Sequence, residues 1–230
     1  MNTEAFIFNW KNHGDKAAIL ERRLSSLAKV TVVNSDEGEK ERFPKWIHLD
    51  NNAYFAAQWN TTVQRFKGDL LFHIQADATL DDFKPLFRRA LQYFAKHNVG
   101  IYEPNIDYTG IPYTTDKLQL LADQVYEVPM TDTTCWFIDG NIMRRYPLID
   151  LNVNKYGWGV AAVTAALCCD QNKFCVRDYS FTVLHPRHHG YSLKDASIQR
   201  EAYVKSLDPQ LSLKTYNIYQ RAKELRATIN

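Results

Sequence analysis

Hydrophobic and polar positions follow two alternating periods along the first hundred residues. Short apolar runs of strand length occur at 5–9, 29–33, 45–49, 70–74 and 99–102. Between them, over 16–28, 53–66 and 80–97, apolar residues recur every three to four positions, which is the helical period. This succession of strands and helices predicts an α/β fold, with a mostly parallel central sheet flanked by helices.

The second half of the chain is patterned less regularly. Residues 103–116 are rich in turn formers and aromatic residues, which predicts a loop, and a strand is expected within 129–140. Residues 160–169 are small and apolar throughout, so this helix should be buried against the sheet, and 174–184 reads as a further strand. We expect one domain over 1–191. Residues 192–230 should form an amphipathic helical tail that packs on this domain, leads to another module or docks on a protein partner.

Composition excludes several classes of protein. Of its 230 residues, 45% are hydrophobic and 23% are charged, as in ordinary globular domains, and the net charge of +2 gives no reason to expect nucleic acid as a partner. No apolar run approaches the roughly 18–20 residues of a membrane helix. The four cysteines lack the spacing of a disulfide framework or zinc cluster, so we expect free thiols in a cytoplasmic protein.

One strand ends abruptly on a carboxylate. The apolar run 70–74 is followed by Gln75-Ala76-Asp77, and 79–82 then resembles the start of a helix. Because ligands bind at the carboxyl ends of strands in parallel sheets, Asp77 is a candidate functional residue. The alternative interpretation is that Asp77 only ends the strand or caps the next helix.

The surrounding residues resemble a known family. Asn60 precedes Gly68 by eight positions, and Gly68 leads into the strand that ends at Gln75-Ala76-Asp77. This order resembles the nucleotide-sugar glycosyltransferases of the GT-A fold, especially those of family 2, whose strand ends in Asp-x-Asp. Gln75 departs from that pattern, whereas Asp77 matches it. The resemblance covers residues 4–191 and implies transfer of a sugar, with a UDP-sugar as the first candidate donor, to a hydroxyl of a glycan or glycoprotein.

The resemblance also implies where the donor binds. The second acidic residue of the family's motif holds a divalent cation, here Mn²⁺ or Mg²⁺, so Asp77 becomes a metal ligand and His185 its partner at the end of the last strand. The residues implied to contact the nucleotide are Asn9, Trp10, Lys11, Asp36, Asn60 and Gln75. Those implied to bind the diphosphate are Arg187, His188 and His189. The alternative is that Asp36 lies in a solvated turn and that 187–189 form a solvated basic loop.

Gly157-Trp158-Gly159 is the candidate acceptor motif. Glycines allow close approach of the backbone to a ligand, and the indole offers a flat face on which a sugar ring can stack. Tyr113, in the predicted loop, is a second candidate for sugar stacking. Many inverting GT-A enzymes carry an acidic base shortly after such a motif, but 160–166 contains none. An inverting enzyme would therefore need Asp132 or Asp150 as its base, and a retaining one would need no such base.

Two other functions remain compatible with the sequence. A nucleotidyltransferase has a similar nucleotide-binding sheet, but it generally carries a glycine-rich loop after its first strand, and residues 9–15 contain only Gly14. A non-catalytic domain that binds a sugar or nucleotide as a scaffold would be consistent with Gln75 in the acidic signature and with the missing carboxylate after Gly159.

Overall fold

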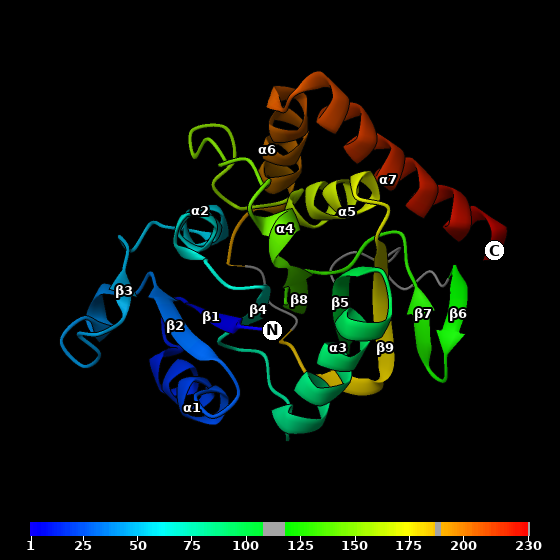
Figure 1. Ribbon diagram of the computed structural model, residues 1–230. Helices are drawn as coiled ribbons and strands as arrows, with labels where there is room; N and C mark the ends of the chain where they lie inside the picture. The colour runs from blue at the N-terminus through cyan, green and yellow to red at the C-terminus, as the bar shows by residue number, and fades with distance from the viewer. Residues whose placement is uncertain (108–117, 187–189, 230) are drawn as a thin grey trace.

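A computed structural model of the chain describes residues 1–107, 118–186 and 190–229. Within these residues one nine-stranded sheet crosses the molecule, and helices cover both of its faces (Figure 1). The strands lie in the order β3-β2-β1-β4-β8-β5-β9-β7-β6. The predicted α/β fold, with its central sheet flanked by helices, is confirmed.

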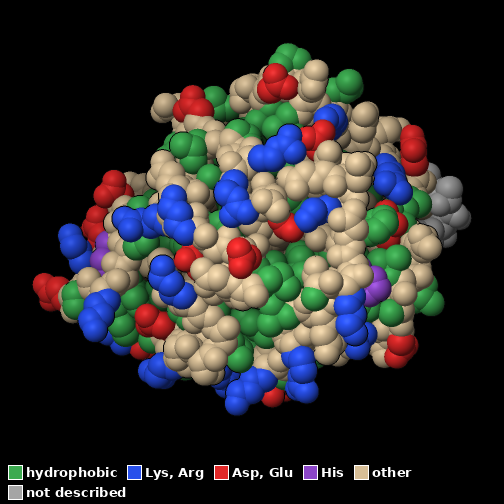
Figure 2. Space-filling model, viewed as in Figure 1, with side chains coloured by type: hydrophobic (Ala, Val, Ile, Leu, Met, Phe, Trp, Pro, Cys, Tyr) green, Lys and Arg blue, Asp and Glu red, His purple; other side chains and the backbone are tan. Residues whose placement is uncertain are grey.

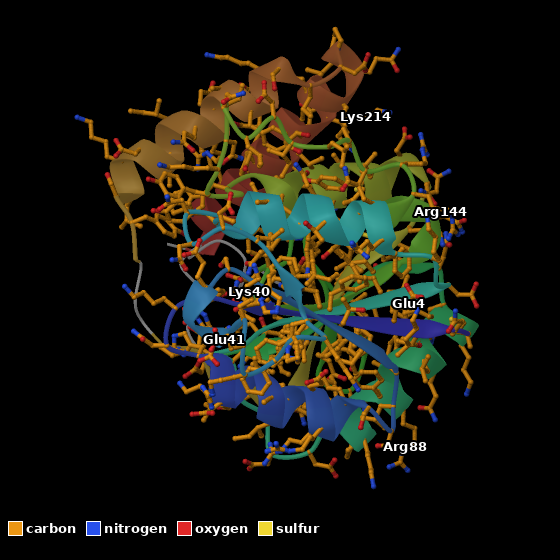
Figure 3. All side chains as sticks on the ribbon, turned by 90° about the vertical axis from the view of Figure 1, so that its left-hand side faces the viewer. Glu4, Lys40, Glu41, Arg88, Arg144 and Lys214 are labelled. Carbon is orange, nitrogen blue, oxygen red and sulfur yellow. The ribbon has the colours of Figure 1, made fainter. Side chains whose placement is uncertain are left out.

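The first half of the sheet is parallel. Its strands are β1 (Thr3–Asn9), β2 (Lys29–Asn34), β3 (Ile47–His48) and β4 (Leu70–Gln75). They are connected by α1 (Gly14–Leu24), the short 3-10 helix η1 (Glu37–Glu39) and α2 (Phe55–Arg65). Asn9 pairs with Asn34, and Phe8 pairs with Gln75, so the carboxyl ends of β1, β2 and β4 lie at one edge. In Figure 3, β1 runs from the side of Glu4 toward the side where Lys40 and Glu41 lie.

The second half of the sheet is mixed. Its strands are β5 (Val99–Ile106), β6 (Gln119–Ala122), β7 (Val125–Glu127), β8 (Cys135–Asp139) and β9 (Phe174–Val183). β8 lies antiparallel between β4 and β5, β9 is parallel to β5, and the β6–β7 hairpin extends the edge. Residues 103–106, which the pattern placed in a loop, continue β5 because most of their side chains are buried.

Side chains alternate between two cores, one on each face of the sheet. Along β1, Ala5 and Ile7 belong to one core, and Phe6 and Phe8 belong to the other, as the two-residue period of a strand requires. The first core lies under α1 and α3 (Phe83–Lys96). The second lies under α2, α4 (Gly140–Met143) and α5 (Val160–Asp170). As predicted, α5 is a buried helix, with 160–168 buried throughout.

The C-terminal helices α6 (Leu193–Ser206) and α7 (Pro209–Ile229) extend this second core. Tyr203 and Ile218 belong to it, and Figure 1 shows α7 running alongside α5. Figure 2 shows lysine and arginine side chains spread over one face of the molecule with acidic side chains between them, as the small net charge suggests. Among the helices in the described ranges, none combines the length and apolar character needed to span a membrane.

Candidate functional site

The structure brings Asp77 and His185 together at the carboxyl edge of the sheet. Asp77 follows β4, and His185 follows β9. The two segments are joined because the N–H groups of Thr79 and Leu184 each donate to the other residue's carbonyl, both at 2.9 Å. His185 Nε2 lies 3.5 Å from Asp77 Oδ1, and both atoms are buried without a hydrogen-bond partner in the part of the chain described.

The charge around His185 is mainly acidic. Burial disfavours its imidazolium, but the carboxylates of Asp77, Asp132 and Asp107 outweigh that effect, and the pKa of His185 is raised above its ordinary value. Asp107 Oδ1 also accepts the backbone N–H of His185 at 2.8 Å, which fixes the segment after β9 against the end of β5.

A second imidazole near Asp77, that of His13, was missed at the sequence level. His13 follows β1 at the start of α1, where the pattern indicated only a turn. Its Nδ1 is buried without a hydrogen-bond partner among the described residues. Burial lowers the pKa of His13, although the charge of Asp77 opposes that change. A histidine four positions after the first strand was the available signal, since that strand ends at the same edge as β4.

The ligand chemistry of Asp77 and His185 suits a divalent cation. A carboxylate oxygen and an imidazole nitrogen fit Mn²⁺ well, whereas Mg²⁺ prefers oxygen ligands alone. No group of three or more His, Cys, Asp or Glu side chains within 1–107, 118–186 and 190–229 could hold a metal ion. The pair would therefore supply two ligands to such an ion, which would take its remaining ligands from solvent or a bound molecule.

A layer of buried amides underlies the ends of β1 and β2. Asn9 Nδ2 donates to Asn34 Oδ1 at 2.6 Å, and Gln58 Nε2 donates to the carbonyl of Asn9 at 2.7 Å. Ser35 Oγ donates to the same carbonyl at 3.1 Å. Asn9 is fully buried, and the hydrogen bond of its amide nitrogen joins the two strand ends.

Asp36 ties together the two loops beside the predicted nucleotide site. Its carboxylate accepts the N–H groups of Asn12 and Gly38, each at 3.0 Å. Asn12 has a φ of 71°, so the loop after β1 turns back sharply toward Asp36. Trp10 is partly buried and its ring meets that of His13 edge-on at 5.9 Å, while Lys11 is exposed.

Two other predicted nucleotide residues make contacts of a different kind. Asn60 exchanges two hydrogen bonds with the backbone of Ile149, at 2.8 and 2.9 Å, and so holds the loop that follows α4. Gln75 is the last residue of β4, with its N–H bound to the carbonyl of Thr134 at 2.9 Å.

The Gly-Trp-Gly segment contains two residues with left-handed backbone conformations. Gly157 and Gly159 have φ values of 77° and 104°, in the region that favours glycine. A Cβ atom on Gly157 would also lie 2.4 Å from the Phe55 ring. Both glycines suit the left-handed turn, and Gly157 also packs against Phe55 at the start of α2.

Trp158 belongs to a partly exposed aromatic cluster with Tyr54, Tyr156 and Tyr191. Trp158 Nε1 donates to Tyr191 Oη at 2.8 Å, and the Tyr191 ring stacks on Tyr156 with a centroid separation of 4.6 Å. The Lys155 ammonium lies 5.2 Å from the Tyr54 ring and 5.1 Å from that of Tyr156. Burial, together with the charges of Asp132 and Tyr156, raises the pKa of Tyr191.

The charge of Asp132 acts on both His185 and Tyr191, so Asp132 lies within electrostatic range of both side chains. It is 8% exposed, and its Oδ1 accepts the N–H and the hydroxyl of Thr134 at 2.9 and 2.7 Å. The Asp132 N–H donates to Glu103 Oε1 at 2.6 Å. Burial raises the pKa of Glu103, and the Arg177 guanidinium that pairs with this carboxylate lowers it.

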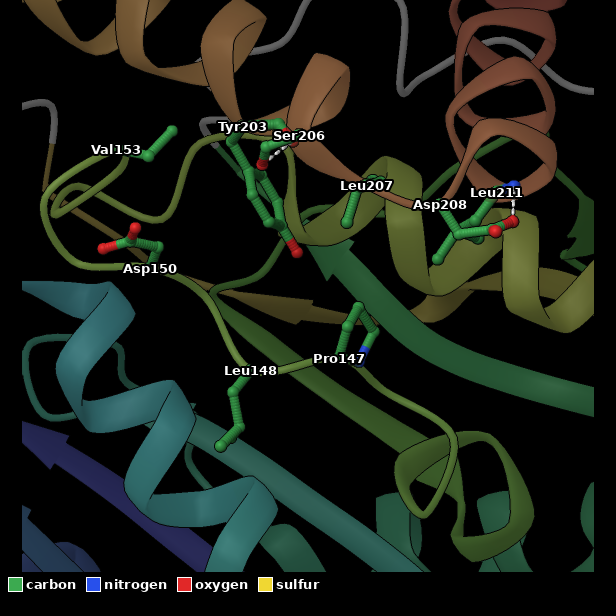
Figure 4. Close-up of a pocket in the computed structure, with 9 residues that line it drawn as sticks. All are labelled: Pro147, Leu148, Asp150, Val153, Tyr203, Ser206, Leu207, Asp208 and Leu211. Atoms are coloured by element: carbon green, nitrogen blue, oxygen red, sulfur yellow. Dashed lines mark hydrogen bonds between the residues drawn. The ribbon is translucent and has the colours of Figure 1, made fainter.

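Asp150, the other candidate base, lies in a different part of the molecule from His185. It lines a pocket of about 340 Å³ beside α6 and the start of α7, which Figure 4 shows with Tyr203 and Leu211 in its wall. Asp150 Oδ1 accepts the N–H of Asn152 at 2.9 Å, so it caps its own turn. Of the two candidate bases, Asp132 is therefore the one whose charge acts on His185. Tyr113, Arg187, His188 and His189 lie outside the described residues.

Comparisons with known proteins reveal similarity at the level of structure. No model of a protein family matches the chain, and no curated protein matches it. GalNAc-T7 with UDP, GalNAc and Mn²⁺ superposes with a TM-score of 0.60 and 14% identity, over 83% of this chain and 44% of that one. The mannosyltransferase PcManGT of Pyrobaculum calidifontis, with GDP-Man and Mn²⁺, superposes with a TM-score of 0.53 and 12% identity. The match covers 99% of this chain and 79% of that one.

TarS of S. aureus, in complex with UDP-GlcNAc, gives a TM-score of 0.56 and 10% identity, over 93% of this chain and 69% of that one. These neighbours are glycosyltransferases of the GT-A type, and the predicted GT-A fold is confirmed. The chain spans less than half the length of the GalNAc-T7 chain.

Proposed function

We propose that this protein transfers a sugar from a nucleoside-diphosphate donor to an acceptor hydroxyl on a glycan, with the help of a divalent cation. One observation carries the proposal. Asp77 and His185 present two buried ligand atoms 3.5 Å apart at the carboxyl edge of a GT-A sheet, and within the described residues neither atom has a hydrogen-bond partner of good geometry. Neighbours with that fold were solved with UDP or GDP-Man and Mn²⁺.

The donor would lie across the ends of β1, β2 and β4. Trp10, Lys11 and Asp36 are the residues proposed to bind the nucleotide, with UDP as the first candidate. Asp77 and His185 would hold Mn²⁺ or Mg²⁺. When bound, the cation supplies positive charge that offsets the negative charge developing on the departing diphosphate.

The acceptor would lie on the side of Trp158, whose orientation is held by the Tyr191 hydroxyl. We assign Asp132 as the general base. Its carboxylate would take the proton of the acceptor hydroxyl while that oxygen attacks the anomeric carbon and the bond from that carbon to the diphosphate breaks. This single displacement inverts the configuration of the sugar.

A non-catalytic scaffold that binds nucleotide is the second candidate. It is favoured by Gln75 at the first acidic position and by the absence of a carboxylate in 160–166. Turnover separates the two functions. A scaffold would bind the nucleotide without hydrolysing or transferring the sugar, whereas Asp132→Asn in an enzyme should preserve donor binding and lower turnover by roughly 10²–10⁴-fold.

Calorimetric titration with UDP, GDP and dTDP, each with and without Mn²⁺, tests the donor site. We expect one nucleotide to bind in a Mn²⁺-dependent manner. Asp77→Asn should weaken that binding by about 100-fold or more, since losing a direct ligand should cost at least as much as losing one of its supporting partners. Asp123→Asn, at an exposed carboxylate in the β6–β7 turn, is the matched control and should bind like the parent. If no nucleotide binds with or without Mn²⁺, the proposal is wrong.

A further inference from the structure

Strand β9 departs from regular pairing shortly before it delivers His185. Asp178 pairs with Pro104 of β5, and Thr182 pairs with the next residue of that strand, Asn105. Residues 179–181 therefore have no partners on β5 and form a bulge. Bulges of this kind bend a strand and change the direction of the side chains that follow. The direction in which β9 reaches His185 depends on this bulge.

A buried carboxylate holds the bulge from inside. Asp178 has no exposed surface, and its Oδ1 accepts the N–H of Ser180 at 2.8 Å. Its Oδ2 accepts the Tyr102 hydroxyl at 2.5 Å and lies 2.6 Å from Arg89 Nε. The bulge is thereby tied to β5 through Tyr102 and to α3 through Arg89.

The consequence of the bulge reaches the candidate site within a few residues. Leu184 exchanges two backbone hydrogen bonds with Thr79, and the N–H of His185 is held by Asp107. These bonds form only if β9 emerges from the bulge in the correct register. Because a one-residue slip turns each side chain to the opposite face, a shorter or longer bulge would direct the imidazole away from Asp77.

Burying a charged group is costly, and apolar residues can often replace a buried ion pair without loss of stability. The Asp178 contacts are thus better explained by the geometry that they impose than by stability alone. We propose that Asp178, with Tyr102 and Arg89, positions His185 by fixing the bulge at 179–181. This inference rests on the proposed function only in treating His185 as a metal ligand.

Tyr102→Phe is the sharpest test, since it removes one hydroxyl from Asp178 and leaves the buried ring in place. In the nucleotide-free protein, we expect the Leu184 amide to exchange with solvent about tenfold faster, the change that loss of one hydrogen bond to a charged group produces. Mn²⁺-dependent binding of UDP or GDP should weaken by about tenfold for the same reason. In a His185→Ala background, Tyr102→Phe should cause no further loss of binding, because the positioned group is already absent.

Tyr146→Phe is the matched control. It removes a buried hydroxyl, which bonds to Tyr203 Oη at 3.0 Å, and Tyr146 belongs to the core on the other face of the sheet. This control should leave both the Leu184 exchange rate and Mn²⁺-dependent binding at parent values. The inference is overturned if Tyr102→Phe leaves Leu184 exchange unchanged, or weakens binding equally with and without His185. If the parent binds no nucleotide, the proposed function fails, while the exchange measurement still decides the positioning role.

Discussion

At the scale of single residues, His73 is an imidazole in an apolar environment. Its ring lies among aromatic rings, with centroid separations of 4.1 Å to Phe8, 5.7 Å to Phe55 and 6.2 Å to Trp59. Neither ring nitrogen has a hydrogen-bond partner in the described part of the chain. Burial lowers the pKa of His73 to about 3, so it stays neutral throughout the physiological range.

His73 should make the protein sensitive to acid. Between pH 6.5 and 3 the unfolded chain binds a proton that the native state excludes, so the free energy of unfolding falls by about 1.4 kcal/mol per pH unit as pH drops. His73→Phe should remove this contribution and flatten the dependence of stability on pH between 6 and 4. Urea unfolding at several pH values measures this dependence, and His97→Gln, at an exposed histidine, is the control. Parallel curves for His73→Phe and the parent would contradict the prediction.

Which residues meet at the site could be predicted only in part from the sequence. Asp77 and His185 follow strands, and strand ends of a parallel sheet share an edge, so local pattern and family resemblance together were sufficient for that pair. Asn60 is the opposite case. Its partner is the backbone of Ile149, 89 positions away, and no local pattern indicates such a contact. The tie between Trp158 and Tyr191 is likewise a tertiary contact that no local pattern indicates.

At the scale of elements, β5 and β9 are joined by a buried ion pair. Arg177 Nε donates to Glu103 Oε2 at 2.8 Å, and neither side chain is exposed. The other oxygen of Glu103 accepts the N–H of Asp132. The pair therefore joins two strands and also supports the residue assigned as general base.

Removing one partner should be worse than removing both. Glu103→Leu removes the carboxylate that pairs with the buried Arg177 charge, and we expect it to lower the free energy of unfolding by about 3–5 kcal/mol. Adding Arg177→Met should restore most of that loss, because two apolar side chains can fill the space of a buried pair. Urea unfolding of the parent, both single variants and the double variant gives the coupling free energy between Glu103 and Arg177. Additive losses would indicate that the two charges do not depend on each other.

Period and composition predicted that most helices and strands exist, but not every strand's place or direction. α5 was recognisable because it is apolar all round, and β4 because a short apolar run is bounded by Gly68 and Asp77. The position of β8, antiparallel between β4 and β5, depends on long-range topology, and an apolar run reads the same in either direction. The β6–β7 hairpin went unrecognised because its strands are three and four residues long, and β6 is largely exposed.

At the scale of the whole molecule, the C-terminal helices belong to the main core. Thr215, Ile218 and Ala222 are buried at three- to four-residue spacing along α7, which matches a helix face packed on α5. Residues 160–168 of α5 are buried throughout, and α7 is one of the elements that pack against them.

A chain ending at Tyr191 should therefore fold poorly. Without α6 and α7, apolar side chains of α5 become exposed to water. Each such side chain of medium size then stops contributing the roughly 1.5–3 kcal/mol by which its burial stabilises the folded state. We expect residues 1–191 to bind a hydrophobic dye and to lose the cooperative thermal transition of the full chain. A sharp transition together with retained nucleotide binding would indicate instead that 1–191 is an independent domain.

The placement of β8 also has a consequence for folding during synthesis. It lies between β4 and β5, although it follows both in the chain. A nascent chain that has reached the end of β5 thus holds two strands whose native neighbour does not yet exist. Any direct pairing between them must open again before β8 can enter, and such long-range insertion is slow. The segments that carry Asp77 and Asp132 can therefore reach their native positions only after the ribosome has synthesised the chain past Asp139. His185 is added to the site later still.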